Sequence, residues 1–230
     1  MAKVKQPLEE NGIHRAKMWE IMMYALNNTS TNTYMMVVGY ISYFLIGIVG
    51  LASVLAGSIV TIMRIWDGVT DPFVGMMVDK TNGKFGKNRP FIVIGQIIMF
   101  ATTFVMFNFI PKMGTGVRFV AFIIIYMIYI IGYTCQCVVT KSAQTCLTND
   151  PKQRPLFTIF NTVGSLLGMG AMQFFAPILA KNYEGGYASA GFFRTLAPVG
   201  IVISILLTIL AIIGIWEKDQ PKYFGIGGGG

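Results

Sequence analysis

Charged residues are scarce in this sequence. Only 12% of the 230 residues are Asp, Glu, Lys or Arg, whereas 54% are hydrophobic and the mean hydropathy is +0.61. Soluble domains contain about 25% charged residues, so this composition excludes a small water-soluble globule. The hydrophobic residues must be covered by lipid.

Histidine, cysteine and the common catalytic motifs are also rare or missing. His14 is the single histidine, and neither HExxH nor GxSxG occurs, which argues against a membrane-embedded enzyme. Cys135, Cys137 and Cys146 are odd in number and lie in one apolar segment, so they indicate packing residues rather than a disulfide or metal site. No cofactor is predicted from these residues.

Long apolar runs dominate the rest of the chain. Several reach the roughly 20 residues that a helix needs to cross a bilayer, and they lack the strict alternation of barrel strands. The sequence therefore predicts an all-α membrane protein with six transmembrane helices. The predicted spans are 20–47, 50–78, 90–111, 118–147, 156–180 and 195–216.

The net charge of +8 gathers in alternate inter-span segments, so it predicts membrane topology rather than a nucleic-acid partner. Cytoplasmic loops of membrane proteins carry an excess of Lys and Arg. The basic segments therefore predict that both termini lie in the cytoplasm and that the six helices span the cell membrane. The basic residues of these segments are Lys3, Lys5, Arg15, Lys17, Lys80, Lys84, Lys87, Arg89, Lys152, Arg154, Lys218 and Lys222.

The domain organisation follows from the spans. Residues 1–19 form a cytoplasmic N-terminal segment, 20–216 one transmembrane bundle, and 217–230 a cytoplasmic linker. The glycine-rich end Ile226–Gly230 is typical of a linker, and it suggests a chain that stops in the middle of a longer protein.

Charged residues inside predicted spans are expensive in a bilayer and therefore indicate function. Asp67 and Asp71 lie four residues apart on one helical face, which Arg64 shares. Two carboxylates at this spacing favour a site for a coupling cation or proton, whereas an Arg64–Asp67 ion pair with a purely structural role is the alternative. Lys141 either pairs with one of these aspartates or extends its amine toward the membrane surface.

The first span carries a polar run, residues 27–33, with the sequence NNTSTNT. Such groups cannot remain unsatisfied against lipid. We expect them to line a wet cavity that binds a polyol, although contacts between helices would also satisfy them. Asn161 in the fifth span would extend this lining, and Asp79 is placed to receive Arg89 or a helix N-terminus.

The segment RIWDGVTDP from Arg64 to Pro72, followed by Gly75, Asp79 and GKNRP at 86–90, resembles the glycoside-pentoside-hexuronide:cation symporters, a branch of the major facilitator superfamily. The resemblance extends to Tyr133-Thr134 and to Asn149–Arg154. It implies a twelve-helix fold of two halves, of which this chain resembles the N-terminal half. It also implies that Asp67, Asp71 and Thr134 bind the coupling cation, Na⁺ or H⁺, with Arg64 and Lys141 tuning the charge.

The sequence departs from the family at three positions expected to touch the sugar. Thr31, Cys137 and Asn161 stand where melibiose permease-like members have two acids and an arginine, so neither sodium coupling nor a melibiose-like sugar carries over. Proton coupling and uniport both stay open. The predicted substrate-binding residues are Asn28, Thr31, Asn32, Trp66, Cys137 and Asn161, and the predicted cytoplasmic gate is Asp79 with Arg89.

The function expected from this resemblance is symport of a sugar with a cation by alternating access, the half-bundle rocking against a second six-helix half. The expected partners are thus the sugar, the bilayer and that second half. The alternatives are a membrane receptor or assembly subunit that transports nothing, and a half-transporter that pairs with another chain.

Overall fold

The computed structural model of the protein describes residues 14–219, without the side chains of residues 36–38. Six long helices overlap the six predicted spans and confirm the all-α fold, and no strand occurs among the described residues beyond an isolated bridge between Gly83 and Gly86. The long helices are α1 (Met18–Gly39), α3 (Ser53–Lys80), α4 (Arg89–Asn108), α5 (Thr115–Leu147), α6 (Arg154–Ala180) and α7 (Ala190–Ile215). Short 3₁₀ turns cover Ile110–Lys112 and Gly186–Ala188.

The first predicted span is broken rather than continuous. After α1, the chain turns at Tyr40, forms the short helix α2 (Ile41–Phe44) and ends in a π-helical turn, Leu45–Val49. The break follows Gly39, a poor helix former, and the ring of Tyr40 stacks on Tyr187, with centroids 5.1 Å apart. Gly50, with φ of 81°, then redirects the chain toward α3.

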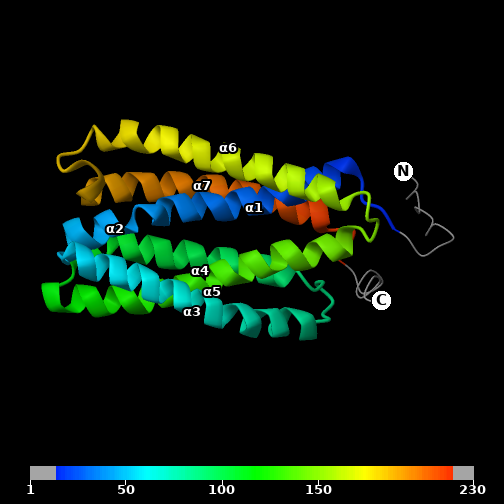
Figure 1. Ribbon diagram of the computed structural model, residues 1–230, viewed down its shortest axis with the longest axis horizontal. Coiled ribbons are helices and arrows are strands. Elements are labelled where there is room, and N and C mark those ends of the chain that lie inside the picture. Colours follow the sequence, from blue (N-terminus) through cyan, green and yellow to red (C-terminus); the bar gives the residue numbers. More distant parts are fainter. Residues whose placement is uncertain (1–13, 220–230) are drawn as a thin grey trace.

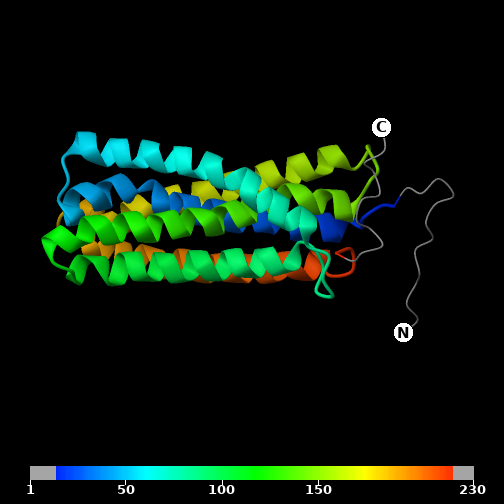
Figure 2. The same ribbon diagram turned by 90° about the horizontal axis from the view of Figure 1, so that it is seen from below.

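The helices lie side by side along the long axis of the molecule (Figures 1 and 2). Helix α1 is central and packs against α5, α6 and α7, while α5 packs against α3 and α4. Close approach of α1 and α7 depends on Gly214, where a Cβ would lie 2.8 Å from the Cβ of Met23. Helix α3 is peripheral, since its long-helix contacts are chiefly with α5.

Four helices of the described chain are long and apolar enough to span a membrane by length and composition alone: Arg89–Lys112, Thr115–Leu147, Arg154–Ala180 and Ala190–Ile215. Helices α1 and α3 are also long, with 22 and 28 residues, but they carry the polar run and the charged face. The two helices that are least suited to lipid are thus the two that the sequence marks as functional.

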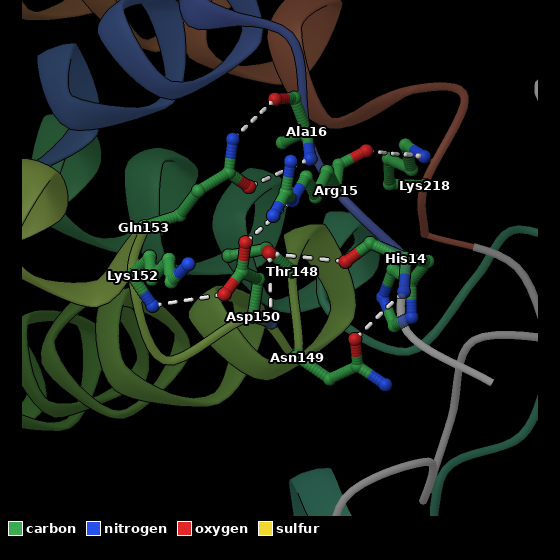
Figure 3. Close-up of polar contacts among 9 residues, drawn as sticks. All are labelled: His14, Arg15, Ala16, Thr148, Asn149, Asp150, Lys152, Gln153 and Lys218. Carbon is green, nitrogen blue, oxygen red and sulfur yellow. Dashed lines mark hydrogen bonds and ion pairs between the residues drawn. The ribbon is translucent and has the colours of Figure 1, made fainter. Parts of the chain in front are cut away.

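One end of the bundle, here called the basic end, is where α1, α4 and α6 begin and α3, α5 and α7 end (Figure 1). There, residues 14–16 lie along the loop between α5 and α6 (Figure 3). Arg15 pairs with Asp150 at 2.5 Å, and the Gln153 side chain bonds both backbone groups of Ala16 at 3.0 and 2.9 Å. Lys218, beyond α7, donates to the carbonyl of Arg15 at 3.2 Å.

A second contact at the basic end is formed by Asp219, whose side chain is fully buried. Its carboxylate accepts hydrogen bonds from the backbone N–H groups of Lys87, Asn88 and Arg89 at 2.9–3.1 Å, at the N-terminus of α4. Arg89 adds an ion pair at 3.4 Å and lies over the Trp216 ring. Gly86, with φ of 91°, lets the loop approach, because a Cβ there would collide with Asp219.

These contacts correct one expectation. Asp79 and Arg89 do not pair with each other, because Asp79 pairs with Lys87 at 3.1 Å and Arg89 pairs with Asp219. Helix α7 ends at Ile215, next to the predicted boundary at 216, and Lys218 and Asp219 beyond it are buried at the basic end. The predicted linker Ile226–Gly230 lies outside the described residues.

Replacing Asp219 by alanine should destabilise the protein by about 3–5 kcal/mol, because it leaves Arg89 and three backbone donors buried without their acceptor. Asp79→Ala is the matched control: its ion pair is exposed and should contribute no more than about 1 kcal/mol. Thermal unfolding of the two variants in detergent measures the difference. Equal losses in both would contradict the role of Asp219.

Candidate ion and substrate site

The predicted cation-binding residues Asp67 and Thr134 are brought together where α3 meets α5. The Thr134 hydroxyl, which is fully buried, donates to Asp67 Oδ1 at 3.2 Å. Thr70 of α3 completes the junction: its hydroxyl lies 2.9 Å from the Thr134 hydroxyl and 2.9 Å from the carbonyl oxygen of Asp67. Thr70 was not predicted from the sequence, although it lies between the two aspartates on α3.

Asp71 and Arg64 lie on α3 but outside this junction. Both side chains are exposed within the half-bundle. Arg64 forms no ion pair within 4 Å in the described part of the chain, so the purely structural Arg64–Asp67 pair does not form. The charges of α3 therefore remain available to a ligand, an ion or a second half.

A pocket of about 170 Å³ opens beside Asp67. Its walls come from α3, from α5 and from the break between α1 and α2, where Gly39, Ile41 and Ser42 line it. Pockets for drug-sized ligands measure about 300–1,000 Å³, so this pocket is smaller than such a site. The remaining lining residues are Met35, Val60, Met63, Arg64, Tyr126, Tyr129, Ile130 and Tyr133.

The three tyrosines of this pocket were not predicted. Tyr126, Tyr129 and Tyr133 follow one another at intervals of three and four residues, which places them on one face of α5. The rings of Tyr126 and Tyr129 stack with centroids 5.7 Å apart. The hydroxyl of Tyr129 is buried and has no hydrogen-bond partner among residues 14–219. Their helical spacing was the feature of the sequence that could have identified these three tyrosines as a shared face.

The polar run of α1 mostly joins helices rather than lining a cavity. Asn27, Ser30, Thr31 and Thr33 are buried at 0–5% exposure. Ser30 bonds Ser204 and Thr208 of α7, and both Asn28 and Asn32 donate to Ser165 of α6 at 2.8 Å. The expectation of a wet cavity is therefore wrong for most of the run, because α1 is central and has helices on three sides.

The other predicted site residues lie on three different helices, α3, α5 and α6. Trp66 donates from Nε1 to the carbonyl of Met127 at 3.3 Å. Cys137 is half-buried beside Tyr133. Asn161 accepts at its backbone carbonyl from Asn28, at 3.4 Å. Lys141 is exposed and, among the described residues, forms no ion pair with Asp67 or Asp71.

Comparison with known proteins places this geometry in a family. Residues 23–224 match the family described as "MFS/sugar transport protein". The chain belongs to this family. Its members are transporters rather than enzymes, and the sugar-symporter family that the sequence resembles is confirmed.

Two relatives illustrate the match. The "Uncharacterized symporter YnaJ" of Bacillus subtilis is 27% identical over 87% of this chain and 43% of the relative. The "Isoprimeverose transporter" of Lactiplantibacillus pentosus is 26% identical over 87% of this chain and 42% of its own length. The chain thus spans less than half the length of these two curated relatives.

A solved structure shows the same fold. The major facilitator superfamily proton:xylose symporter XylE, bound to 6-bromo-6-deoxy-D-glucose, superposes with a TM-score of 0.66 at 14% identity. The match covers 90% of this chain and 48% of that chain. The six helices therefore correspond to about half of a major facilitator fold.

Two buried tyrosines should respond differently to loss of their hydroxyls. Tyr34 OH accepts a hydrogen bond from Gln96 at 3.1 Å, so Tyr34→Phe leaves a buried amide unsatisfied and should cost about 1–3 kcal/mol. Tyr129→Phe removes a buried hydroxyl without a partner, so it should leave stability unchanged or raise it. Thermal unfolding in detergent compares them, and a larger loss for Tyr129→Phe would refute the assignment.

Proposed function

We propose that the protein transports a sugar together with a cation, Na⁺ or H⁺, by alternating access, and that this half-bundle rocks against a second half. The observation that carries the proposal is the contact of Asp67 with Thr134 at the wall of a tyrosine-lined pocket. A carboxylate beside a pocket can bind a cation and a polar ligand at neighbouring positions, so that one affects the other.

The chemistry of the pocket suits a sugar. Aromatic rings pack against the apolar face of a sugar ring, while polar groups such as Arg64, Asp67 and Ser42 can bond its hydroxyls. The printed names of relatives support this substrate class: one is an isoprimeverose transporter and another, from Escherichia coli, a "Putative glycoside/cation symporter".

We propose that the second half packs over the charged face of α3. Arg64 and Asp71 are exposed in the middle of α3, and charges within a membrane-spanning helix face a protein or a water-filled cavity rather than lipid. A receptor or assembly subunit, in which polar groups only join helices, gives no reason for these exposed charges. We further propose that the basic end faces the cytoplasm in the cell membrane.

The test is uptake of a labelled panel of glucosides, galactosides, xylosides and hexuronates into vesicles that contain the protein expressed from its complete reading frame. Uptake is measured with and without Na⁺ and pH gradients. We expect accumulation of at least one sugar with the wild type and its loss with Asp67→Asn and Asp71→Asn. A folded protein that takes up and exchanges none of these sugars would favour the receptor or subunit alternative.

A further inference from the structure

Three tyrosines of the half-bundle are almost completely buried, and they differ in the hydrogen bonding of their hydroxyls. Tyr24, Tyr34 and Tyr129 are each 1% exposed. The Tyr24 hydroxyl donates to a backbone carbonyl oxygen of α5 at 2.7 Å, and the Tyr34 hydroxyl accepts from Gln96 at 3.1 Å. The Tyr129 hydroxyl has no hydrogen-bond partner among residues 14–219. Buried tyrosine hydroxyls usually have one, so that of Tyr129 requires a separate explanation.

The hydroxyl of Tyr129 does not stabilise the half-bundle. A buried hydroxyl without a partner has lost its hydrogen bonds to water and has gained none in the protein. Phenylalanine offers the same ring without this loss. Unsatisfied buried groups in native proteins are explained by a functional role, or by a water or ion that binds them. The position of Tyr129 therefore decides what its hydroxyl can bind.

Tyr129 lines the pocket of about 170 Å³ beside Asp67. A protein that packs on the outside of the bundle cannot contact a side chain that is 1% exposed. A partner for the Tyr129 hydroxyl must therefore enter the pocket, and the volume of the pocket limits this partner to a small molecule or to one ring of a larger one.

The pocket combines aromatic surface with hydroxyl groups. The rings of Tyr126 and Tyr129 stack with 9° between their planes, and Ser42 adds a hydroxyl from α2. The break between α1 and α2 provides the space: Gly39 lines the pocket without a side chain, and a Cβ there would meet no atom within 4 Å. Such a lining suits a ligand that has both apolar C–H groups and hydroxyls, as a sugar ring has.

The pocket is separate from the residues that the family resemblance indicates for the sugar. None of the six predicted substrate-binding residues is among its lining residues. On α5, the predicted residue Cys137 follows Tyr129 by eight positions toward the basic end, which is about 12 Å along a helix. The pocket thus lies farther from the basic end than the sugar position predicted from the resemblance.

We propose that this pocket is an additional sugar subsite, in which the Tyr129 hydroxyl forms a hydrogen bond with one hydroxyl of the transported sugar. The proposal deepens the proposed function and rests on it. Tyr129 is then a specificity-determining residue. It distinguishes a sugar that has this hydroxyl from the deoxy analogue, because the analogue leaves the buried tyrosine hydroxyl unpaired.

The experiment uses proteoliposomes with the protein expressed from its complete reading frame. Exchange of labelled against unlabelled sugar, with the panel of glucosides, galactosides, xylosides and hexuronates, first identifies a transported sugar. Competition by each monodeoxy analogue of that sugar then measures the contribution of each hydroxyl. We expect the wild type to bind one analogue about three- to tenfold more weakly than the parent sugar, the range for one hydrogen bond.

Tyr129→Phe should bind the parent sugar more weakly by the same factor, and it should no longer distinguish the parent from that one analogue. The other analogues should compete with the parent as they do in the wild type. This coupling between one protein hydroxyl and one sugar hydroxyl is a double-mutant cycle, which a purely structural effect would not produce. Tyr43→Phe is the matched control, because Tyr43 is exposed and does not line the pocket.

A second variant tests the space of the pocket without changing a tyrosine. Gly39→Leu should fill the pocket and weaken sugar binding at least tenfold, since its side chain enters open space. Gly116→Leu is the control: a Cβ there also meets no atom within 4 Å, and Gly116 lies at the start of α5, outside the pocket. Thermal unfolding in detergent verifies that all four variants are folded.

The outcomes separate this subsite from the proposed function. Equal affinity of wild type and folded Tyr129→Phe for the parent sugar overturns the subsite and leaves sugar transport intact. The same holds if Tyr129→Phe retains the wild-type discrimination against every analogue, or if folded Gly39→Leu binds the sugar as the wild type does. Absence of any sugar exchange by folded wild-type protein overturns the proposed function and the subsite with it.

Discussion

The contact between Thr134 and Asp67 is the polar link by which α3 is held to the bundle. Helix α3 packs chiefly on α5, and within a membrane its polar groups cannot turn to water for partners. The Asp67 and Thr70 contacts with Thr134, together with the bond from Trp66 to Met127, supply them. A change in the protonation or ligation of Asp67 is therefore also a change in how α3 is attached.

The remaining polar residues divide between scaffold and site. On α1, Ser30 and Asn32 form hydrogen bonds across the interfaces with α7 and α6, which join the three helices. At the basic end, Asp219 ties the segment after α7 to α4, and residues 14–16 tie the segment before α1 to the α5–α6 loop. The exposed charges of α3 and the pocket between α3 and α5 remain as the candidate site.

Sequence alone could predict the parts of this structure that depend on local pattern. Hydropathy gives the six spans, and the charged residues of the second span together with the family resemblance give Asp67 and Thr134. The polar run of α1 was ambiguous, because a cavity and a helix interface both need hydrogen-bonding groups, and only packing decides between them. Asp219 could not be found, because its partners lie about 130 residues earlier in the sequence.

Other differences between the predictions from sequence and the structure have similar causes. The break at Tyr40 follows from a weak signal, Gly39, combined with stacking on a distant tyrosine. Arg89 was matched with the acid nearest in sequence, whereas the fold brings it a fully buried one. Local pattern thus predicted which helices form, and tertiary contacts determined which charges meet.

The most direct measurement is gradient-driven accumulation of labelled sugars by the protein in proteoliposomes, recorded for wild type and Asp67→Asn. If Asp67 is the ion site of a sugar symporter, the wild type should accumulate at least one sugar under a Na⁺ or pH gradient, and Asp67→Asn should not. Equal accumulation by a folded Asp67→Asn variant would contradict this assignment.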